Sequence, residues 1–142
     1  MKQMLCQMEK QGEGSILNVA SSAGLLPAGP YMATYYATKS YVTSLTRAVA
    51  LELKEKKSNV YVGALCPGPV DTEFNKVANV EFAIPSITPT YCASYAIRKM
   101  EKRKIVIVPK NKMKVLAFIS RVLPQSLVIR MTARQQKKKR SW

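Results

Sequence analysis

Residues 15–24 read SILNVASSAG, and this stretch decides the fold. A short apolar run that ends in a cluster of serine and glycine predicts a buried β-strand followed by a loop. A second run, VYVGALC at 60–66, ends in PGPVDT at 67–72, and a third, IVIV at 105–108, is stopped by Pro109. Helical segments separate the three runs. This alternation predicts an α/β fold with a parallel sheet, and right-handed crossovers would place its three strands side by side.

The segments between and after the strands carry helical patterns. Apolar Met4, Leu5 and Met8 predict an amphipathic first helix, whereas Pro27, Gly29 and Pro30 keep the loop at 21–33 free of helix until about Ala33. The segment 67–87 is irregular. The predicted helices cover residues 1–11, 34–57, 89–101, 112–122 and 125–137, with a break at Pro124 between the last two.

Two of these helices carry more specific signals. In the helix at 34–57, Val42, Leu45, Val49 and Leu53 recur at helical spacing and predict its buried stripe. Thr88 followed by Pro89 predicts a capped start for the helix at 89–101.

Tyr35 and Lys39 stand one helical turn apart, and Ser22 lies thirteen residues before Tyr35. Residues i and i+4 share a helix face, so the phenol and the ammonium point the same way. A fixed ammonium nearby stabilises the phenolate and makes the phenol a better acid. A serine hydroxyl from a separate loop would then hold a substrate oxygen beside it. The three side chains predict a proton-transfer site for a carbonyl/alcohol pair.

These motifs, in this order, resemble the short-chain dehydrogenase/reductase family over roughly residues 1–110. The resemblance implies an α/β fold, the C-terminal part of a Rossmann-type doubly wound parallel sheet. Residues 111–142 would form a basic helical extension. It also implies that Tyr35 is the general acid/base and contributes to cofactor binding, that Lys39 activates it and binds the nicotinamide ribose, and that Ser22 positions the carbonyl.

Two neighbouring residues compete for these roles. The thirteen-residue offset favours Ser22 over Ser21, and Tyr35 is favoured over Tyr36 because only Tyr35 has a lysine four residues on.

The strand exit at 67–72 matches family positions near the nicotinamide. The resemblance implies that Pro67, Gly68, Val70 and Thr72 contribute to cofactor binding, with Val70 and Thr72 touching the carboxamide. Taken from the residues alone, a plain turn followed by a helix capped by Thr72 explains the same stretch.

The implied cofactor is NAD or NADP, and the sequence does not distinguish between them. No Gly-x-x-x-Gly-x-Gly turn occurs in the 142 residues, and Gly12-Glu13-Gly14 precedes a strand, so it is not a phosphate loop. We therefore expect the chain to be the C-terminal part of such an enzyme, without its cofactor-binding N-terminal half and inactive alone.

Charge and cysteine content set the remaining limits. Residues 98–142 hold fifteen Lys/Arg and one acidic residue, for a net charge of +14, whereas residues 1–97 are nearly neutral at +1. Cys6, Cys66 and Cys92 form no CxxC and the chain has no histidine, so we expect no metal site. An odd cysteine count without a secretory leader predicts a cytoplasmic protein.

The basic C-terminal segment has two interpretations. Its apolar residues would either cover the end of the sheet as a lid or lie on an anionic membrane, and we rank the lid first. The residues concerned are Val115, Leu116, Phe118, Ile119, Val122 and Leu123. No nucleic-acid recognition motif accompanies the charge, so we expect no nucleic-acid partner.

Two functions follow. The first is an NAD(P)-dependent oxidoreductase that interconverts a small-molecule carbonyl and alcohol, with homo-oligomers formed through helices 1–11 and 34–57 as the resemblance implies. The alternative is a non-catalytic family remnant or interaction module, attached to membranes through its basic tail.

Overall fold

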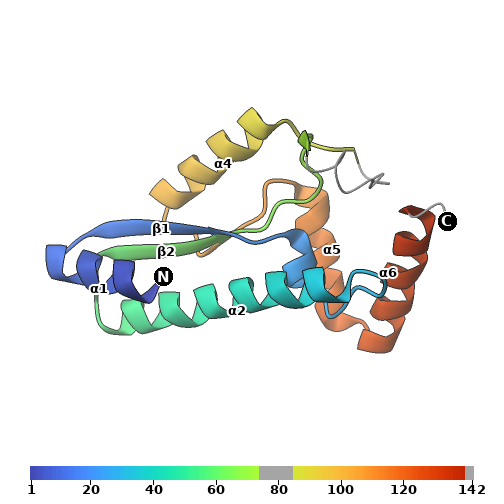
Figure 1. The fold of residues 1–142 in the computed structure, drawn as a ribbon, viewed down its shortest axis with the longest axis horizontal. Helices are drawn as coiled ribbons and strands as arrows, with labels where there is room; N and C mark the ends of the chain where they lie inside the picture. Colours follow the sequence, from blue (N-terminus) through green and yellow to red (C-terminus); the bar gives the residue numbers. More distant parts are fainter. Residues whose placement is uncertain (74–84, 140–142) are drawn as a thin grey trace.

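The computed structural model describes residues 1–73 and 85–139 and shows a three-layered α/β arrangement (Figure 1). Its centre is a parallel sheet in the order β1-β2-β3. The α-helices and strands, in chain order, are α1 (Lys2–Gln11), β1 (Gly14–Val19), α2 (Ala33–Glu55), β2 (Val60–Leu65), α4 (Pro89–Glu101), β3 (Val106–Ile107), α5 (Asn111–Val122) and α6 (Gln125–Lys139).

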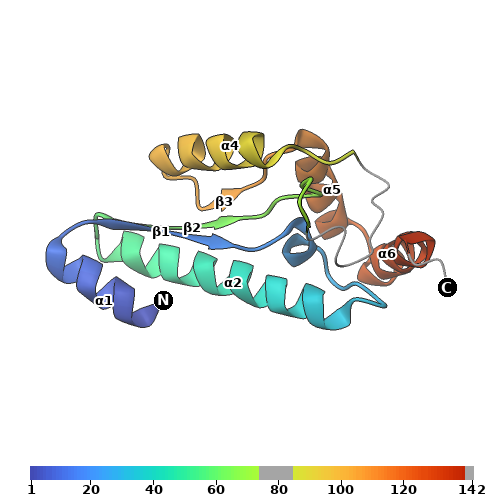
Figure 2. The same ribbon diagram turned by 45° about the horizontal axis from the view of Figure 1, so that its top comes forward.

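The sheet separates two helical layers. Figure 2 shows α1 and α2 on one face and α4 on the other, with α5 and α6 at the end toward which the strands run. β1 and β2 pair along their whole length, from Gly14 opposite Val60 to Val19 opposite Leu65. The three predicted strands therefore do lie side by side, which confirms the predicted fold class.

β3 is shorter than predicted. The pattern at 105–108 suggested four strand residues, but only Val106 and Ile107 form the strand, opposite Ala64 and Leu65. Ile105 still accepts a hydrogen bond from the Ala64 amide, at 2.7 Å. Beyond Ile107 the chain turns through Pro109, which has no N–H to continue the ladder.

The core has three clusters, arranged by layer and by position along the strands. Leu53, Val60 and Val62 pack with Leu5 and Met8 of α1, which confirms the predicted apolar side for these two residues, whereas Met4 is exposed. Leu65, Cys92, Ala96 and Ile107 fill the space beneath α4. Ala20, Ala64, Cys66, Val108 and Met113 form the third cluster at the carboxyl ends of the strands.

The predicted stripe on α2 is confirmed at Leu53, and Val42 and Val49 are partly buried against the core, but the other fully buried positions lie one residue further along the helix. The buried positions facing the sheet are Thr43, Thr46, Ala50 and Leu53, while Val42, Leu45 and Val49 are only partly buried. Threonine can be buried here because each hydroxyl donates to a carbonyl of its own helix, Thr43 to Lys39 at 2.8 Å and Thr46 to Val42 at 2.7 Å. The helix thus hides two polar residues without leaving a polar group unpaired.

The predicted cap of α4 is confirmed. The hydroxyl of Thr88 accepts a hydrogen bond from the Tyr91 amide at 3.2 Å, and Pro89 occupies the first turn. The predicted irregular segment at 67–87 lies in part, at 74–84, outside the described residues.

The C-terminal helices dock on the body only in part. Val128, Thr132 and Gln136 recur every four residues on α6 and are buried. Met113 and Leu116 of α5 join the third core cluster. The prediction that the apolar tail residues form a lid is corrected for Val115, Phe118, Ile119 and Val122, which are exposed. No helix within the described ranges is long and apolar enough to cross a membrane.

Candidate functional site

The predicted catalytic residues lie where β1 and β2 end. In parallel sheets, ligand sites form at the carboxyl ends of the strands. Ser22 begins a 3₁₀ turn, Ser22–Leu25, that follows β1, and its amide donates to the Pro67 carbonyl at 2.8 Å. This bond joins the loop after β1 to the exit of β2, so Ser22 and the Pro67-Gly68 stretch are held side by side.

A glycine lets the serine-bearing turn approach α2 closely. A Cβ at Gly24 would lie 2.4 Å from the carbonyl oxygen of Lys39 and 2.6 Å from the hydroxyl of Thr43. Since such distances are not tolerated, only glycine fits here. The SSAG turn is therefore packed against the helical turn that carries Lys39.

Lys39 is held in place by the end of β1. Its ammonium donates to the carbonyl of Val19 at 3.1 Å and lies 5.8 Å from the centre of the Tyr35 ring. The ammonium has two further N–H donors that this bond does not use. The predicted common face of Tyr35 and Lys39 is thus present, with the cation fixed at the carboxyl end of the strand.

The two adjacent tyrosines have different environments. Tyr36 is buried, and its hydroxyl accepts a hydrogen bond from the side chain of Gln136 at 2.9 Å. Burial raises the pKa of Tyr36, while the Gln136 bond acts in the opposite direction. Tyr35 is half-buried, and within residues 1–73 and 85–139 no hydrogen bond reaches its hydroxyl. Of the two, Tyr35 therefore has the phenol that can meet a substrate.

The two adjacent serines also have different environments. Ser21 is buried, and its hydroxyl accepts from the Ala23 amide at 3.2 Å, which caps the 3₁₀ turn. Ser22 is half-buried and lies one residue further on. The residue that caps this turn is therefore Ser21 and not Ser22.

The predicted cofactor-binding residues fall into two groups. Gly68 lies against α5, since a Cβ there would lie 3.1 Å from Cγ of Met113. Val70 bridges to Ile87, and the Asp71 amide donates to the Ile87 carbonyl at 2.9 Å. Thr72 is exposed. The structure thus brings Pro67 and Gly68 close to the Ser22 loop, whereas Val70 and Thr72 follow along the same exit.

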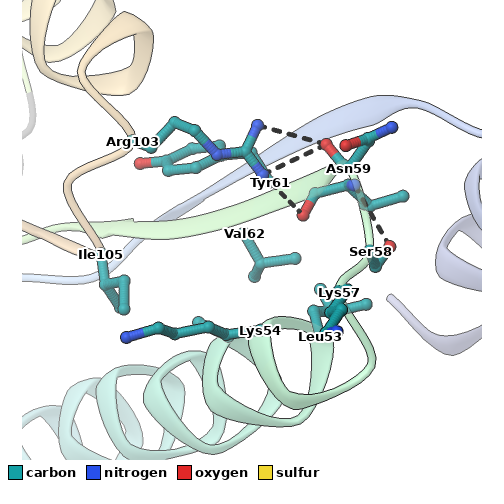
Figure 3. A pocket seen from close by; sticks show the side chains of 11 residues that line it. Leu53, Lys54, Lys57, Ser58, Asn59, Tyr61, Val62, Arg103 and Ile105 are labelled. Atoms are coloured by element: carbon teal, nitrogen blue, oxygen red, sulfur yellow. Dashed lines mark hydrogen bonds between the residues drawn. The ribbon is translucent and has the colours of Figure 1, made fainter.

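A cavity of about 580 Å³ lies at the opposite end of the sheet (Figure 3). It is bounded by the last turn of α2, the start of β2 and the segment before β3, including Lys54, Lys57, Asn59, Arg103 and Ile105. The Arg103 guanidinium donates to the carbonyls of Asn59 and Val60 at 3.2–3.3 Å. None of the predicted site residues lines this cavity, and its cations are exposed or already bonded to the main chain. The cavity is separate from the predicted proton-transfer residues.

Two features of the site had no sequence signal. Thr43 lies 3.8 Å from the sulfur of Cys66, beneath the loop that bears Ser22, and Gln136 reaches Tyr36 from the far end of the chain. Neither pairing has a local spacing that would reveal it. Across residues 1–73 and 85–139, no group of three His, Cys, Asp or Glu side chains could hold a metal ion.

The chain has many relatives among known proteins. Residues 1–81 match the family model described as short chain dehydrogenase. Over 65 residues the chain is 46% identical to the D-beta-hydroxybutyrate dehydrogenase of Rhizobium meliloti (strain 1021), which covers 46% of this chain and 24% of that protein. Over 101 residues it is 35% identical to the dehydrogenase/reductase SDR family member 4 of Bos taurus, covering 71% of this chain and 34% of that protein.

Solved structures agree with the fold. A structure from a study of 7beta-hydroxysteroid dehydrogenase stereoselectivity superposes with a TM-score of 0.76 at 22% identity, covering 92% of this chain and 50% of that chain. A short-chain dehydrogenase from Sphingobium yanoikuyae in complex with NADPH gives 0.65 at 25% identity, covering 82% and 46%. The chain spans about a quarter to a third of the length of these curated relatives. Because the family match covers more than half of the chain, the chain belongs to the short-chain dehydrogenase family.

Proposed function

We propose that this chain carries the proton-transfer site of an NAD(P)-dependent oxidoreductase that interconverts a carbonyl and an alcohol. The observation that supports it most is the position of Lys39, whose ammonium is tied to the end of β1 and lies next to the Tyr35 ring. This bond distinguishes Lys39 from a lysine whose ammonium extends into solvent. In this reading residues 1–110 are the C-terminal part of the Rossmann domain and residues 111–142 are an extension.

The chain's own residues supply the proton and its placement. In the reductive direction the Tyr35 hydroxyl donates its proton to the carbonyl oxygen of the substrate, and in the oxidative direction the Tyr35 phenolate removes it from the alcohol. The Lys39 ammonium stabilises the phenolate through its charge. Ser22 donates a hydrogen bond to the same substrate oxygen and orients it toward Tyr35.

The donor set is compatible with a nicotinamide cofactor. Lys39 keeps two N–H donors that suit the hydroxyls of a ribose, and the exposed hydroxyl of Thr72 suits a carboxamide. The cofactor, when bound, supplies or accepts the hydride. Relatives agree with this choice, since one is described as a D-beta-hydroxybutyrate dehydrogenase and another is in complex with NADPH.

The test compares adjacent residues in an active protein that contains this sequence. Tyr35→Phe removes the proton donor, so we expect turnover to fall by about 10²–10⁴-fold. Tyr36→Phe is the matched control, because it deletes a buried hydroxyl one residue away and should leave turnover within a few-fold when assayed well below the unfolding temperature. Turnover is read from NADH or NADPH absorbance with a panel of ketones and secondary alcohols.

A second pair tests the serine assignment. Ser22→Ala should lower turnover, whereas Ser21→Ala should lower stability through the lost cap, by about 0.5–2 kcal/mol. If Tyr35→Phe kept most of its activity, or if Ser21→Ala abolished turnover in a folded protein, the assignment would be wrong.

A further inference from the structure

One face of α5 is apolar and exposed, although the opposite face of the same helix is buried. Met113 and Ser120 point into the body. The outward residues recur at i, i+3, i+4 and i+7, the spacing of a single helical stripe. These residues form what we call the outer face of α5: Val115, Phe118, Ile119 and Val122, exposed by 56%, 68%, 44% and 73%.

Cations flank this outer face on both sides. By helical spacing, Lys112 falls on one side of the stripe and Lys114 and Arg121 on the other, and all three are exposed. The Lys114 ammonium already donates to the Tyr95 hydroxyl at 3.1 Å and to Oδ1 of Asn111 at 3.2 Å, so headgroup contact falls to Lys112 and Arg121. Burial lowers the pKa of Arg47 on α2, and the positive charge of Arg121 lowers it further, so these two cations repel each other. The sequence has no aspartate or glutamate after Glu101 that could compensate.

We propose that the outer face of α5 binds an anionic membrane, with the helix lying parallel to the surface. An apolar stripe bordered by lysine and arginine matches the chemistry of the boundary between acyl chains and charged headgroups. The apolar side chains enter that boundary while the cations on either side reach the headgroups. A protein core placed on the same face would have to bury Lys112 or Arg121 without an acidic partner from this part of the chain.

The fold presents this face in a fixed orientation. α6 is anchored by buried Val128, Thr132 and Gln136, and α5 is anchored by Met113. The two interpretations of the C-terminal helices, a lid on the body and a contact with a membrane, are therefore compatible. The inner sides of the two helices cover the body, and the outer side of α5 stays available.

The experiment is co-sedimentation of the full chain with sucrose-loaded vesicles of phosphatidylcholine alone or with about 30% phosphatidylserine, at about 0.05 and 0.15 M salt. We expect binding to the anionic vesicles, weaker at the higher salt, and little binding to phosphatidylcholine. Phe118→Ser/Val122→Ser should reduce the partition coefficient by at least about tenfold at the higher salt. Both positions are exposed, and circular dichroism verifies that the variant is folded.

A matched control removes exposed apolar residues from another helix. Tyr91→Ser/Ile97→Ser on α4 deletes side chains exposed by 47% and 58% and should leave partition unchanged. Lys112→Gln/Arg121→Gln should reduce binding to anionic vesicles only. To measure how deeply the outer face of α5 enters the membrane, Phe118→Trp is made in a Trp142→Phe background. The fluorescence emission of this variant should shift to shorter wavelength when anionic vesicles are added.

Several results would overturn the proposal. One is the absence of binding, and another is equal binding to both vesicle types. A third is unchanged binding of Phe118→Ser/Val122→Ser, which would assign the affinity to the basic residues alone. If the same variant instead converted an oligomer into a monomer by analytical ultracentrifugation and kept its vesicle binding, the outer face of α5 would be a contact between copies of the chain. None of these outcomes depends on dehydrogenase activity.

Discussion

The side-chain amide of Gln136 donates a hydrogen bond of 2.9 Å to the hydroxyl of Tyr36, across 100 residues of sequence. Both residues are buried, with 4% and 8% of their surface exposed. The Tyr36 ring also lies edge-on to Tyr35, with ring centres 6.3 Å apart. The last helix of the chain is thereby attached to the helical turn that carries the proposed acid/base.

This bond should be measurable as an energetic coupling. Tyr36→Phe leaves the Gln136 amide buried without a partner and Gln136→Leu does the same to the tyrosine, so each should lower the free energy of unfolding by about 1–3 kcal/mol. The double variant should lose less free energy of unfolding than the two single variants together, and the difference should be about 0.5–3 kcal/mol. Urea unfolding followed by circular dichroism measures all four proteins. Tyr41→Phe, which changes an exposed ring on the same helix, is the control, and strict additivity would show that the two groups do not interact.

The three thiols should react in a fixed order. Cys6 is exposed, whereas Cys66 and Cys92 are buried, and burial raises the pKa of both buried thiols. Since the thiolate is the reactive form, Ellman's reagent at pH 8 should modify Cys6 quickly and Cys66 only when the structure opens. Cys6→Ser should remove the fast phase alone. Rapid modification of Cys66 in the native protein would contradict its placement beneath the Ser22 loop.

Alkaline pH should destabilise the fold. In the unfolded chain the thiols ionise near 9.0 and the tyrosines near 10.0, but burial raises the pKa of Cys66, Cys92, Tyr36 and Tyr61 in the folded chain. The unfolded state therefore loses its protons first, and stability is intact below pH 9.0 and falls as pH rises through the folded values. Urea midpoints at closely spaced pH values test this. Cys66→Ala should flatten the first part of the decline, and Cys6→Ala should not.

The isolated 142-residue chain should not bind a dinucleotide with micromolar affinity. A diphosphate is normally held by a glycine-rich turn at a helix N-terminus, and this sequence has no Gly-x-x-x-Gly-x-Gly pattern. Calorimetric titration with NADH and NADPH tests the prediction. Saturable micromolar binding would mean that the residues at 67–72 hold the cofactor with far more affinity than proposed.

The chain should associate with itself through the helical layer formed by α1 and α2. α1 has no buried residue, and Met4, Tyr41 and Leu51 are large apolar side chains exposed on these two helices. Tyr41→Asp/Leu51→Asp should shift the chain toward monomer in analytical ultracentrifugation, because it places two carboxylates in an apolar contact. Ile97→Asp on α4 is the matched control. A compact wild-type monomer at high micromolar concentration would contradict the prediction.

Local signals predicted most of the fold. The helix at 89–101 was placed to the residue because the Thr88-Pro89 pair marks its start chemically, and the observed cap uses the predicted hydroxyl. The strands expected at 15–20 and 59–65 agree with β1 and β2 to within one residue at each end, since glycine, serine and proline bound these apolar runs. The approach of Ser22 to the exit of β2 follows from parallel topology alone.

Features that depend on distant partners could not be predicted in the same way. Threonine counts as a polar residue when a sequence is searched for the apolar face of a helix, so the pattern does not place Thr43 and Thr46 in the core. Their side chains are suited to the core only because their hydroxyls bond to carbonyls of the helix. The exposed side of α5 has the same spacing as a buried one, so the sequence alone could not decide between lid and surface. The anchoring of α6 by Gln136 requires knowledge of where residue 36 lies.

The contact between Met113 and Gly68 has a thermodynamic consequence. Met113 is on the inner face of α5, and Gly68 lies at the strand exit where the proposed cofactor residues begin. A ligand that moves this exit and α5 together would couple its own binding to the binding of a surface by α5. Linkage requires both effects to have the same magnitude, so a dinucleotide that tightens attachment to lipid by a given factor would itself be bound more tightly by that factor on the membrane.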